Sequence, residues 1–445
     1  MDAFDVIIVG AGYAGLTCAV RLAGRTRKRG LRIALVGNSA FFLERLRLHE
    51  GLTEPDFILP SRLPRLMDFL AGPSCVFVQG EVREIDRAER CVRLDTPDGA
   101  RFLSYGQLVI ALGSRTNAAA PGADRHAFVL DADGPRALPA LRRRLASLAT
   151  PESRMPESRM IVVGGGATGI EVAAELVRVA GARVTIIESG SFAGFATPAV
   201  KRRLAEAVDR AGILVREHAR VEVVEPDRVV TSAGAVPCDI CVWCAGFVGQ
   251  PVIRAAGFET DDAGRIRVDP WLRALGDPHV FAVGDAGIPV EHCGAPPRMS
   301  AFFALTTGAH AADTIARLYA GKPPRPFGFW TWGQAIAVGR EAVGYATIPH
   351  DRQVGPIYRK RTAFRIRSFF VWLLVRLIGL QRRFPALPFW LGRGAYRREE
   401  VQRHARPKLT PIDGTTPLTH AMPEGLAVRS AGKTARSRAS RKEPS

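Results

Sequence analysis

Two glycine-rich turns, far apart in the chain, have the residue types and spacing that bind phosphate. Residues 6–9 form a β-branched run that leads into Gly10-Ala11-Gly12-Tyr13-Ala14-Gly15 and then into a helical pattern. Residues 160–163 lead in the same way into Gly164-Gly165-Gly166-Ala167-Thr168-Gly169. Glycine lets the backbone approach a phosphate, and a helix N-terminus offers unpaired N–H donors. Two strand–turn–helix units therefore predict two dinucleotide sites. The expected contacts are Gly10, Gly12, Tyr13, Ala14 and Gly15 at the first site, and Gly164, Gly166, Thr168 and Gly169 at the second.

The two units differ in the acidic residue that usually holds the adenosine ribose, about 20 residues after the turn. In the second unit, residues 184–187 form a strand that ends in Glu188. A 2′-phosphate there would meet a carboxylate, which favours NADH over NADPH. In the first unit, residues 33–36 end in Gly37 and Asn38, so the acid is missing. This weakens the ribose contact without excluding FAD at that site.

Size and charge limit the class of protein. The chain has 445 residues, 47% of them hydrophobic, which is enough for two or three globular domains. Its net charge of +19 is concentrated late, with eleven basic and no acidic residues between Ile357 and Arg398. A general nucleic-acid-binding surface is therefore not indicated. The first residues lead directly into a strand and leave no room for a signal peptide, so we expect a cytoplasmic protein.

The seven cysteines have no disulfide-scaffold spacing, which suits a reducing compartment. Cys238, Cys241 and Cys244 form a CxxCxxC pattern that could hold a cluster or zinc. Residues 239–245, however, read as a β-strand, whose alternating side chains would not aim three thiolates at one point. We therefore expect no metal site.

Four motifs occur in the order of one enzyme family. They are the two glycine turns, the segment Tyr105 to Ser114, and residues 280–285, Val-Phe-Ala-Val-Gly-Asp. With them the chain resembles the FAD-dependent pyridine nucleotide-disulfide oxidoreductase superfamily over about residues 4–345. Within it, the chain is similar to type II NADH dehydrogenases and apoptosis-inducing-factor-like NADH reductases. The resemblance implies FAD in the first unit, NADH in the second, and a hydride passed between them.

The resemblance also implies individual roles. Asp285 would accept hydrogen bonds from the ribityl or pyrophosphate end of FAD, with Gly284 giving backbone access. Glu171 would lie near the nicotinamide carboxamide and orient it, and Gly246 belongs to the turn beside NADH. Further FAD contacts are expected at Val82, whose backbone would meet the adenine, and at Ala111 and Gly113.

The expected fold class is α/β, with two Rossmann-like dinucleotide-binding domains, the second inserted in the first, and a C-terminal α+β, membrane-associated segment. The FAD-binding domain would comprise residues 1–118 and 263–325, and the NAD(P)H-binding domain 119–262. A C-terminal module would span 326–400 and a disordered basic tail 401–445.

The disulfide reductases of the superfamily carry a redox-active cysteine pair after the first ribose-binding strand. Here residues 41–49 contain no cysteine, so we expect no thiol relay, and electrons should leave the reduced flavin directly for an exogenous acceptor. His49 is a candidate proton donor near the flavin, or simply a histidine packed at a helix end. Arg45 is a candidate partner for the pyrophosphate charges.

A basic amphipathic helix is predicted from about Arg361 to Phe384. Its apolar run is too short to span a bilayer, which needs about 20 residues. Arginines fall on one face and Ile366, Phe370, Leu373, Leu374 and Leu377 on the other, as in a helix that lies in an anionic lipid surface, with Trp372 and Trp390 as anchors. Arg367 falls on the apolar face and would have to snorkel. The alternative is a helix packed on the protein's own body or on a second copy in a homodimer.

These observations predict an NADH:quinone reductase that does not pump protons, peripheral on the inner face of the cell membrane. The segment Arg298 to Gly308 lacks the glutamine that typical type II enzymes have near the quinone. The rival hypotheses are a soluble reductase of a ferredoxin-type carrier, which would dock on the basic surface, and a non-catalytic dinucleotide-binding sensor or scaffold.

Overall fold

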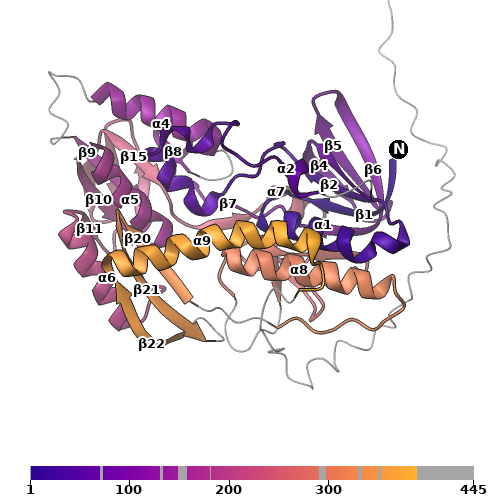
Figure 1. Ribbon diagram of the computed structural model, residues 1–445. Helices are drawn as coiled ribbons and strands as arrows, with labels where there is room; N and C mark the ends of the chain where they lie inside the picture. The colour runs from indigo at the N-terminus through magenta and orange to yellow at the C-terminus, as the bar shows by residue number, and fades with distance from the viewer. Residues whose placement is uncertain are drawn as a thin grey trace, which may run out of the picture. The chain divides into compact units, whose positions relative to one another are not determined.

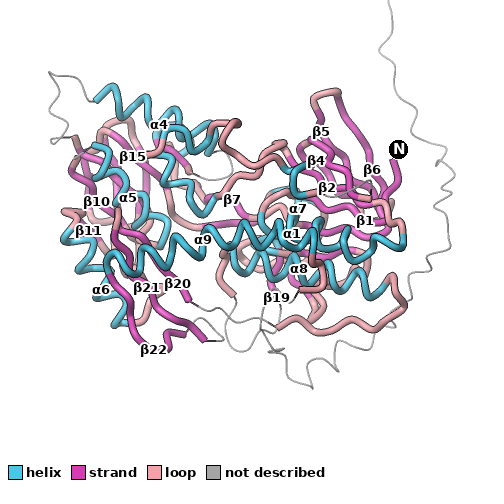
Figure 2. The backbone as a smooth tube through the Cα atoms, in the orientation of Figure 1, coloured by secondary structure: helices cyan, strands magenta, loops and turns pink. Residues whose placement is uncertain are grey.

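The computed structural model describes residues 2–70, 74–130, 134–148, 158–180, 182–289, 297–328, 333–348 and 352–387. Two sheets, one mainly and one entirely parallel, with helices against them dominate these residues (Figures 1 and 2). This confirms the predicted α/β fold class. The tail at 401–445 and Trp390 lie outside the described residues, as does the end of the proposed C-terminal module.

The first sheet has the strand order β3-β2-β1-β6-β5-β4, and β18 also pairs with β6. Its strands are β1 (Asp2–Val9), β2 (Ile33–Gly37), β3 (Cys75–Gln79), β4 (Glu81–Asp86), β5 (Cys91–Thr96), β6 (Gly99–Ile110) and β18 (Val280–Ala282). All pairs are parallel except β4–β5 and β5–β6. The apolar residues 6–9 of β1 are fully buried, as expected for a parallel strand covered on both faces.

The second sheet is parallel throughout, with the order β11-β10-β9-β15-β8. Its strands are β8 (Ala127–Val129), β9 (Arg159–Val163), β10 (Arg183–Ile187), β11 (Leu214–Arg216) and β15 (Ile240–Trp243). All of them lie in the chain between β6 and β18 of the first sheet. The second Rossmann-like unit is therefore inserted in the first, as predicted, while the domain boundaries given above stay a prediction.

Two short antiparallel strands follow the two sheets and pair with each other. They are β7 (Ser114–Thr116), after β6, and β16 (Phe247–Gly249), after β15. The pairing brings the turn at Gly113 and the turn at Gly246 to the same region, where the Asn117 N–H donates to the Gly246 carbonyl at 3.1 Å. The two predicted sites are thus connected at the ends of their parallel strands, where ligands bind in such sheets.

Two long helices of the first unit pack closely. These are α1 (Tyr13–Thr26) and α8 (Ala301–Leu318), and they approach at Gly308. A Cβ on Gly308 would lie 2.1 Å from the Ala14 carbonyl oxygen, so only glycine allows this approach. The helix of the second unit that corresponds to α1 is α5 (Ala167–Ala180).

The remaining elements connect or flank the two sheets. The helices are η1 (Arg27–Arg29), η2 (Arg45–Leu52), η3 (Pro55–Ile58), α2 (Leu66–Phe69), α3 (Ala123–His126), α4 (Gly134–Leu148), α6 (Pro198–Arg210), α7 (Pro251–Ala255) and η5 (Gly284–Ala286). The strands β12 (Val221–Val224), β13 (Arg228–Thr231) and β14 (Gly234–Pro237) form an antiparallel sheet, and β17 (Ile266–Val268) pairs with β19 (Gly287–Pro289).

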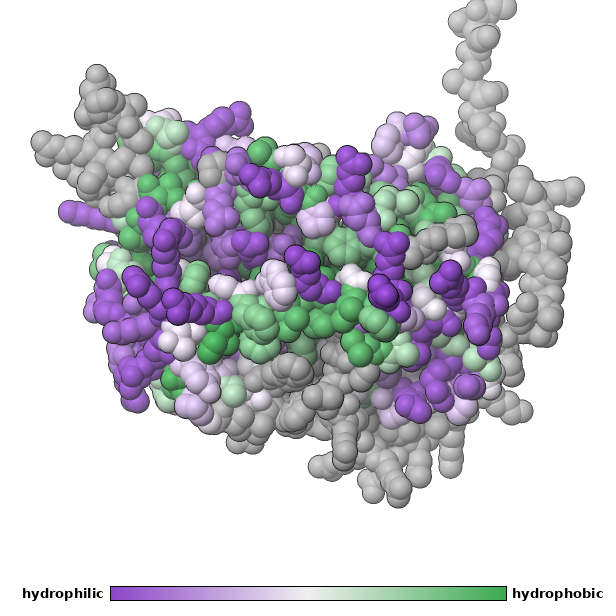
Figure 3. All heavy atoms as spheres, in the orientation of Figure 1, coloured by the Kyte–Doolittle hydropathy of each residue, from purple (hydrophilic) through white to green (hydrophobic). Residues whose placement is uncertain are grey.

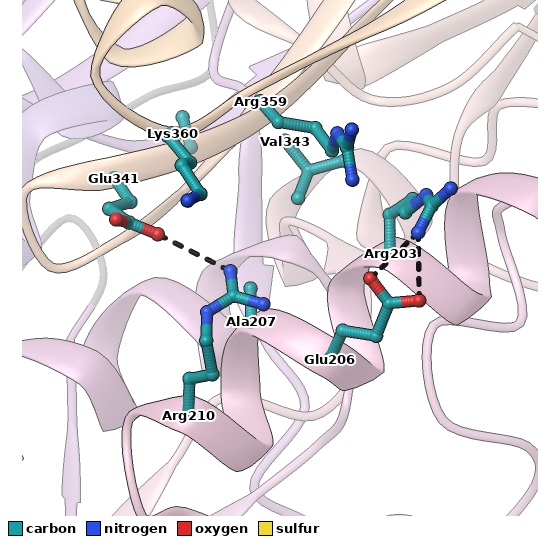
Figure 4. Close-up of a pocket in the computed structure, with 9 residues that line it drawn as sticks. Arg203, Glu206, Ala207, Arg210, Glu341, Val343, Arg359 and Lys360 are labelled. Carbon is teal, nitrogen blue, oxygen red and sulfur yellow. Dashed lines mark hydrogen bonds and ion pairs between the residues drawn. The ribbon is translucent and has the colours of Figure 1, made fainter.

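An antiparallel sheet and a long helix follow these units. The strands are β20 (Gly333–Val338), β21 (Glu341–Ile348) and β22 (Arg352–Arg359), and the helix is α9 (Lys360–Arg383). A small pocket with a volume of about 30 Å³ lies between α6, β21 and the start of α9. Figure 4 shows the side chains that line it. In it Arg210 pairs with Glu341 at 3.3 Å, which connects α6 to β21. The bounds of α9 confirm the helix predicted from about Arg361 to Phe384.

One face of α9 packs on the protein itself. Ala363, Arg367, Val371, Ile378 and Gln381 are buried at helical spacing. The expectation that Arg367 snorkels from a lipid-facing side is therefore wrong, because its side chain points into the protein and is only 5% exposed. The helical wheel had placed Arg367 among apolar residues correctly, but that face meets protein.

The opposite side of α9 exposes large apolar residues. Phe369 is 55% exposed, Trp372 54% and Leu380 38%. Arg365 and Arg376 are exposed beside them. Among the described residues, no helix is both long enough and apolar enough to cross a bilayer.

Candidate functional site

The first glycine turn has an open approach at its middle glycine. Gly10 adopts a φ of +103°, and a Cβ there would lie 2.2 Å from the Ala111 carbonyl oxygen. A Cβ on Gly15 would lie 1.8 Å from the Gly10 carbonyl oxygen. A Cβ on Gly12, by contrast, would meet no atom within 4 Å, and Gly12 is exposed at the start of α1. The outer glycines let the turn close, and the middle one leaves free space at a helix N-terminus.

The second turn repeats this geometry. Gly164 has a φ of +109°, and a Cβ on Gly169 would again lie 1.8 Å from the carbonyl oxygen of the turn's first glycine. A Cβ on Gly166 would meet nothing within 4 Å. Thr168 lies in the first turn of α5, with its side chain partly exposed. Both turns therefore fit a pyrophosphate, which needs a bare backbone and free N–H donors.

Glu188 lies at the far end of the second turn, directly after β10. Its carboxylate accepts hydrogen bonds from the Gly165 N–H at 2.7 Å and the Gly190 N–H at 2.9 Å. These two bonds hold the carboxylate in place beside the glycine turn. That position agrees with the predicted contact to the adenosine ribose hydroxyls.

Asp285, Ser114 and Arg45 meet near the first turn. The Ser114 hydroxyl donates to the Asp285 carboxylate at 2.8 Å, and Arg45 donates to the Ser114 carbonyl at 3.0 Å. Burial raises the pKa of Asp285, and the Ser114 hydrogen bond and the Arg45 charge oppose the shift only in part. A buried carboxylate is stabilised by further donors, so Asp285 fits a ligand with hydroxyl groups, as a ribityl chain has.

The other residues predicted at FAD surround this cluster. The Gly284 N–H donates to the Thr307 hydroxyl at 2.8 Å, and a Cβ on Gly284 would lie 3.1 Å from the Ala14 Cβ. The Gly113 turn, with a φ of +67°, lies beside the Arg45 guanidinium. Tyr13 is buried edge-to-face against Phe42, with ring centroids 5.1 Å apart. Val82 is half-buried in β4, away from these contacts, and its predicted contact with the adenine stays a prediction.

Glu171 and His49 belong to a buried charge cluster. The Glu171 carboxylate lies 2.9 Å from the Arg367 guanidinium and also accepts the Ala337 N–H at 3.1 Å. His49 is 5% exposed, with its Nδ1 3.7 Å from the Glu171 carboxylate. Arg367 also contacts Glu50 at 3.3 Å. Its pKa is lowered by burial, but the charges of Glu171 and Glu50 outweigh this and raise the pKa above the usual value.

This cluster gives Glu171 structural partners from α9 and β20. The predicted roles of Glu171 at the nicotinamide and of His49 as a proton donor therefore stay predictions, and the packed position of His49 agrees with the plainer interpretation. No sequence pattern had placed Arg367, Glu50 or Ser114 in these clusters. A signal existed for Arg367, because its place among apolar residues required a buried partner.

The cysteine pattern lies partly in the strand that the sequence predicted. Cys238 and Cys241 are buried beside or within β15, and Cys244 is partly buried after it. Burial raises the pKa of Cys238 to about 11 and that of Cys244 to about 12, which disfavours the thiolate that a metal needs. In the part of the chain that the structure describes, no group of three or more His, Cys, Asp or Glu residues could hold a metal ion.

The sequence profile of the pyridine nucleotide-disulphide oxidoreductases matches residues 4–301. The chain belongs to this family. Its members use FAD and NADH, which fit the two glycine turns described above. When bound, FAD supplies the two-electron chemistry that a protein side chain lacks, and the protein supplies binding and orientation.

Three known proteins that are similar to this chain illustrate the range of its relatives. A demethylphylloquinone reductase of Synechocystis is 29% identical over 351 residues, covering 76% of this chain and 85% of that protein. An NADH dehydrogenase-like protein of Mycobacterium tuberculosis is 31% identical over 303 residues, covering 63% and 72%. The structure of NDH2 from Plasmodium falciparum in complex with NADH has a TM-score of 0.69 at 15% identity and covers 89% of this chain and all of that one.

Proposed function

We propose that the protein is an NADH:quinone oxidoreductase that works at a membrane surface without spanning it. FAD would lie in the first turn, near Asp285, and NADH in the second, near Glu188. The names of the relatives support this proposal, since one reduces demethylphylloquinone and another is NADH dehydrogenase-like. The absence of cysteine from residues 41–49 supports direct transfer to an acceptor without a thiol relay.

The observation that carries the proposal is a groove beside α9. It has a volume of about 1010 Å³ and lies between α9 and the segment that contains η2 and α2. Its lining is mainly apolar, with charged groups that include Glu44, Arg47 and Arg376. The same segment packs on the first turn, where Phe42 meets the Tyr13 ring. A groove of this kind suits an apolar quinone ring and tail that approach the flavin from a membrane.

The exposed side of α9 supports the membrane part of the proposal. Figure 3 shows hydrophobic residues gathered over α9, with hydrophilic residues on either side. Phe369, Trp372 and Leu380 lie there next to exposed arginines. Burying such residues in the lipid interface is favourable, and arginines bind the phosphates of anionic lipids. A position on the inner face of the cell membrane follows if the protein stays in the cytoplasm.

The test removes only the exposed apolar groups. The variant Phe369→Ser/Phe370→Ser changes residues that are 55% and 40% exposed and lie outside the lining of the groove. It should lose binding to vesicles of phosphatidylcholine and phosphatidylglycerol and lose reduction of a long-chain quinone in those vesicles. It should keep its rate with a water-soluble short-chain quinone. Leu214→Ser is the matched control, because Leu214 is 63% exposed on β11 and lies outside this face. Equal loss with both quinones would contradict membrane docking by α9.

The same experiment separates the other hypotheses. If the α9 variant binds vesicles normally but changes from dimer to monomer in sedimentation, this face is a homodimer contact. If the wild type reduces none of the quinones but reduces an acidic ferredoxin, the protein is a soluble reductase. If the protein binds both nucleotides but NADH does not reduce its flavin, the protein is a non-catalytic sensor or scaffold.

A further inference from the structure

One backbone hydrogen bond occurs in both glycine turns and shows which residues of the two units correspond. The Gly10 N–H donates to the Val36 carbonyl at 2.9 Å, and the Gly164 N–H donates to the Ile187 carbonyl at 2.8 Å. Residue 37 in the first unit therefore occupies the place of Glu188 in the second. The same alignment makes Ala11 the counterpart of Gly165.

In the second unit this pair of positions holds a carboxylate. Glu188 accepts the Gly165 N–H at 2.7 Å, and a Cβ on Gly165 would lie only 3.2 Å from the Glu188 Cβ. Gly165 thus gives the acidic side chain room beside the turn. The second glycine turn and the N-terminus of α5 form a phosphate-binding site, the second cradle, and the first turn and the N-terminus of α1 form the first cradle. The Glu188 carboxylate lies at the end of the second cradle, where a ribose hydroxyl can donate to it.

In the first unit the side chain of this pair lies on the glycine turn, and the residue after the strand has none. Ala11 carries a methyl group and residue 37 is glycine. A Cβ on Gly37 would lie 2.8 Å from the Ala11 Cβ and 3.3 Å from the Phe77 ring. The backbone carbonyl oxygen of Ser39 would lie 3.7 Å from the same Cβ. This end of the first cradle is therefore lined by a methyl group, an aromatic ring and a backbone carbonyl, where the second has a carboxylate.

We propose that Ala11 and Gly37 make the first cradle indifferent to the ribose hydroxyls of the adenosine half of its dinucleotide. The adenosine end of FAD is held by apolar contact and backbone groups. The affinity comes from the phosphates at the helix N-terminus and from the ribityl and flavin end near Asp285. In the second cradle, by contrast, the Glu188 carboxylate accepts hydrogen bonds from the ribose hydroxyls.

The test compares FAD with the analogue whose adenosine carries 2′-deoxyribose. Apoprotein freed of flavin is titrated with each compound, and the dissociation constant is taken from flavin fluorescence. The wild type should bind the two within about threefold of each other, because no charged hydrogen bond is lost. The variant Ala11→Gly/Gly37→Glu copies the second unit and should prefer FAD by about tenfold or more, since a carboxylate then accepts from the hydroxyl.

Glu188→Gln provides the matched control in the second cradle. The wild type should bind NADH more tightly than its 2′-deoxyadenosine analogue, and this preference should shrink in the variant. If the double variant of the first cradle does not fold, Ala11→Gly/Gly37→Ser replaces it, with a smaller gain of a neutral hydrogen bond.

Two results would overturn the proposal. One is a wild-type preference for FAD of tenfold or more over the deoxy analogue. The other is a folded Ala11→Gly/Gly37→Glu variant that still binds both compounds equally, because residue 37 would then lie away from the ribose. Neither measurement involves NADH oxidation or a quinone, so its outcome is independent of the function proposed above.

Discussion

Arg367 on α9 and Glu171 on α5 form a buried ion pair at 2.9 Å, although 196 positions separate them in the chain. Glu50 of η2 joins the same guanidinium at 3.3 Å. Through this one side chain, α9 is attached both to the helix that follows the second glycine turn and to the segment beside the first. The helix that exposes apolar residues to its surroundings is thus fixed to both dinucleotide-binding units.

Replacing Arg367 by Met should destabilise the protein by about 3–5 kcal/mol, because the buried Glu171 carboxylate loses its cation, while the half-buried Glu50 keeps only its pair with Arg47. Thermal unfolding followed by circular dichroism measures this loss. Arg365→Met is the control, since Arg365 is exposed on the same helix and should change stability by less than about 0.5 kcal/mol. Equal effects of the two variants would show that the buried pair contributes nothing special.

Gly308→Ala should force α8 away from α1, because its Cβ would lie 2.1 Å from the Ala14 carbonyl oxygen. We expect a loss of about 1–3 kcal/mol of stability and faster release of flavin. Gly379→Ala, in the interior of α9, meets nothing within 4 Å and should be neutral or stabilising. Chemical denaturation of both variants, with flavin release followed by fluorescence, distinguishes these outcomes. A stable Gly308→Ala variant that retains its flavin would mean that the helices can separate without cost.

Glu188→Gln should reduce the preference of the enzyme for NADH over NADPH. The neutral amide keeps a similar shape but no longer repels a 2′-phosphate, and it accepts more weakly from the ribose hydroxyls. The Michaelis constant for NADH should rise and that for NADPH should fall. Glu206→Gln, a change in a surface ion pair with Arg203 on α6, should leave the ratio of the two unchanged. An unaltered nucleotide preference in Glu188→Gln would remove Glu188 from the site.

The raised pKa of Asp285 predicts a pH dependence of flavin binding. A carboxylate that accepts hydrogen bonds from FAD binds best when ionised, so affinity should fall as the pH drops through this raised pKa. The stability of the apoprotein should instead rise as the pH falls through the same range. The cost of burying the charge is complete above the raised pKa and disappears as the pH falls toward about 3.9, the value of an unfolded aspartate.

Asp285→Asn should bind FAD more weakly at neutral pH and lose this acidic limb of the binding curve. Flavin fluorescence measured between neutral and mildly acidic pH gives both quantities. Asp209→Asn, at an exposed position on α6, is the control and should keep the wild-type curve. A pH profile that survives in Asp285→Asn would assign the dependence to another group.

The local parts of the fold could be predicted from the sequence. Each strand–glycine–helix unit is encoded by consecutive residues, so the turns at Gly10 and Gly164 follow from short-range pattern alone. The missing acid at Gly37 could be seen for the same reason, since it directly ends a strand. The long helix α9 was visible from its periodicity.

The contacts between distant segments could not be predicted. The helical wheel of α9 shows which residues share a face, but it contains no information on whether that face meets lipid or protein. Arg367 looked like a misplaced surface charge because its partner Glu171 lies far away in the chain. Ser114 was overlooked because a single hydroxyl after a glycine turn has no distinctive pattern, and only the fold brings it to Asp285.

The most direct test mixes the purified yellow protein with one equivalent of NADH in the absence of oxygen and then adds a quinone. The visible flavin absorbance should bleach on the first addition and return on the second, with the number of titratable thiols constant throughout. A flavin that stays oxidised in the presence of NADH, or new thiols that form as it is bleached, would contradict an electron path through two dinucleotide sites without sulfur.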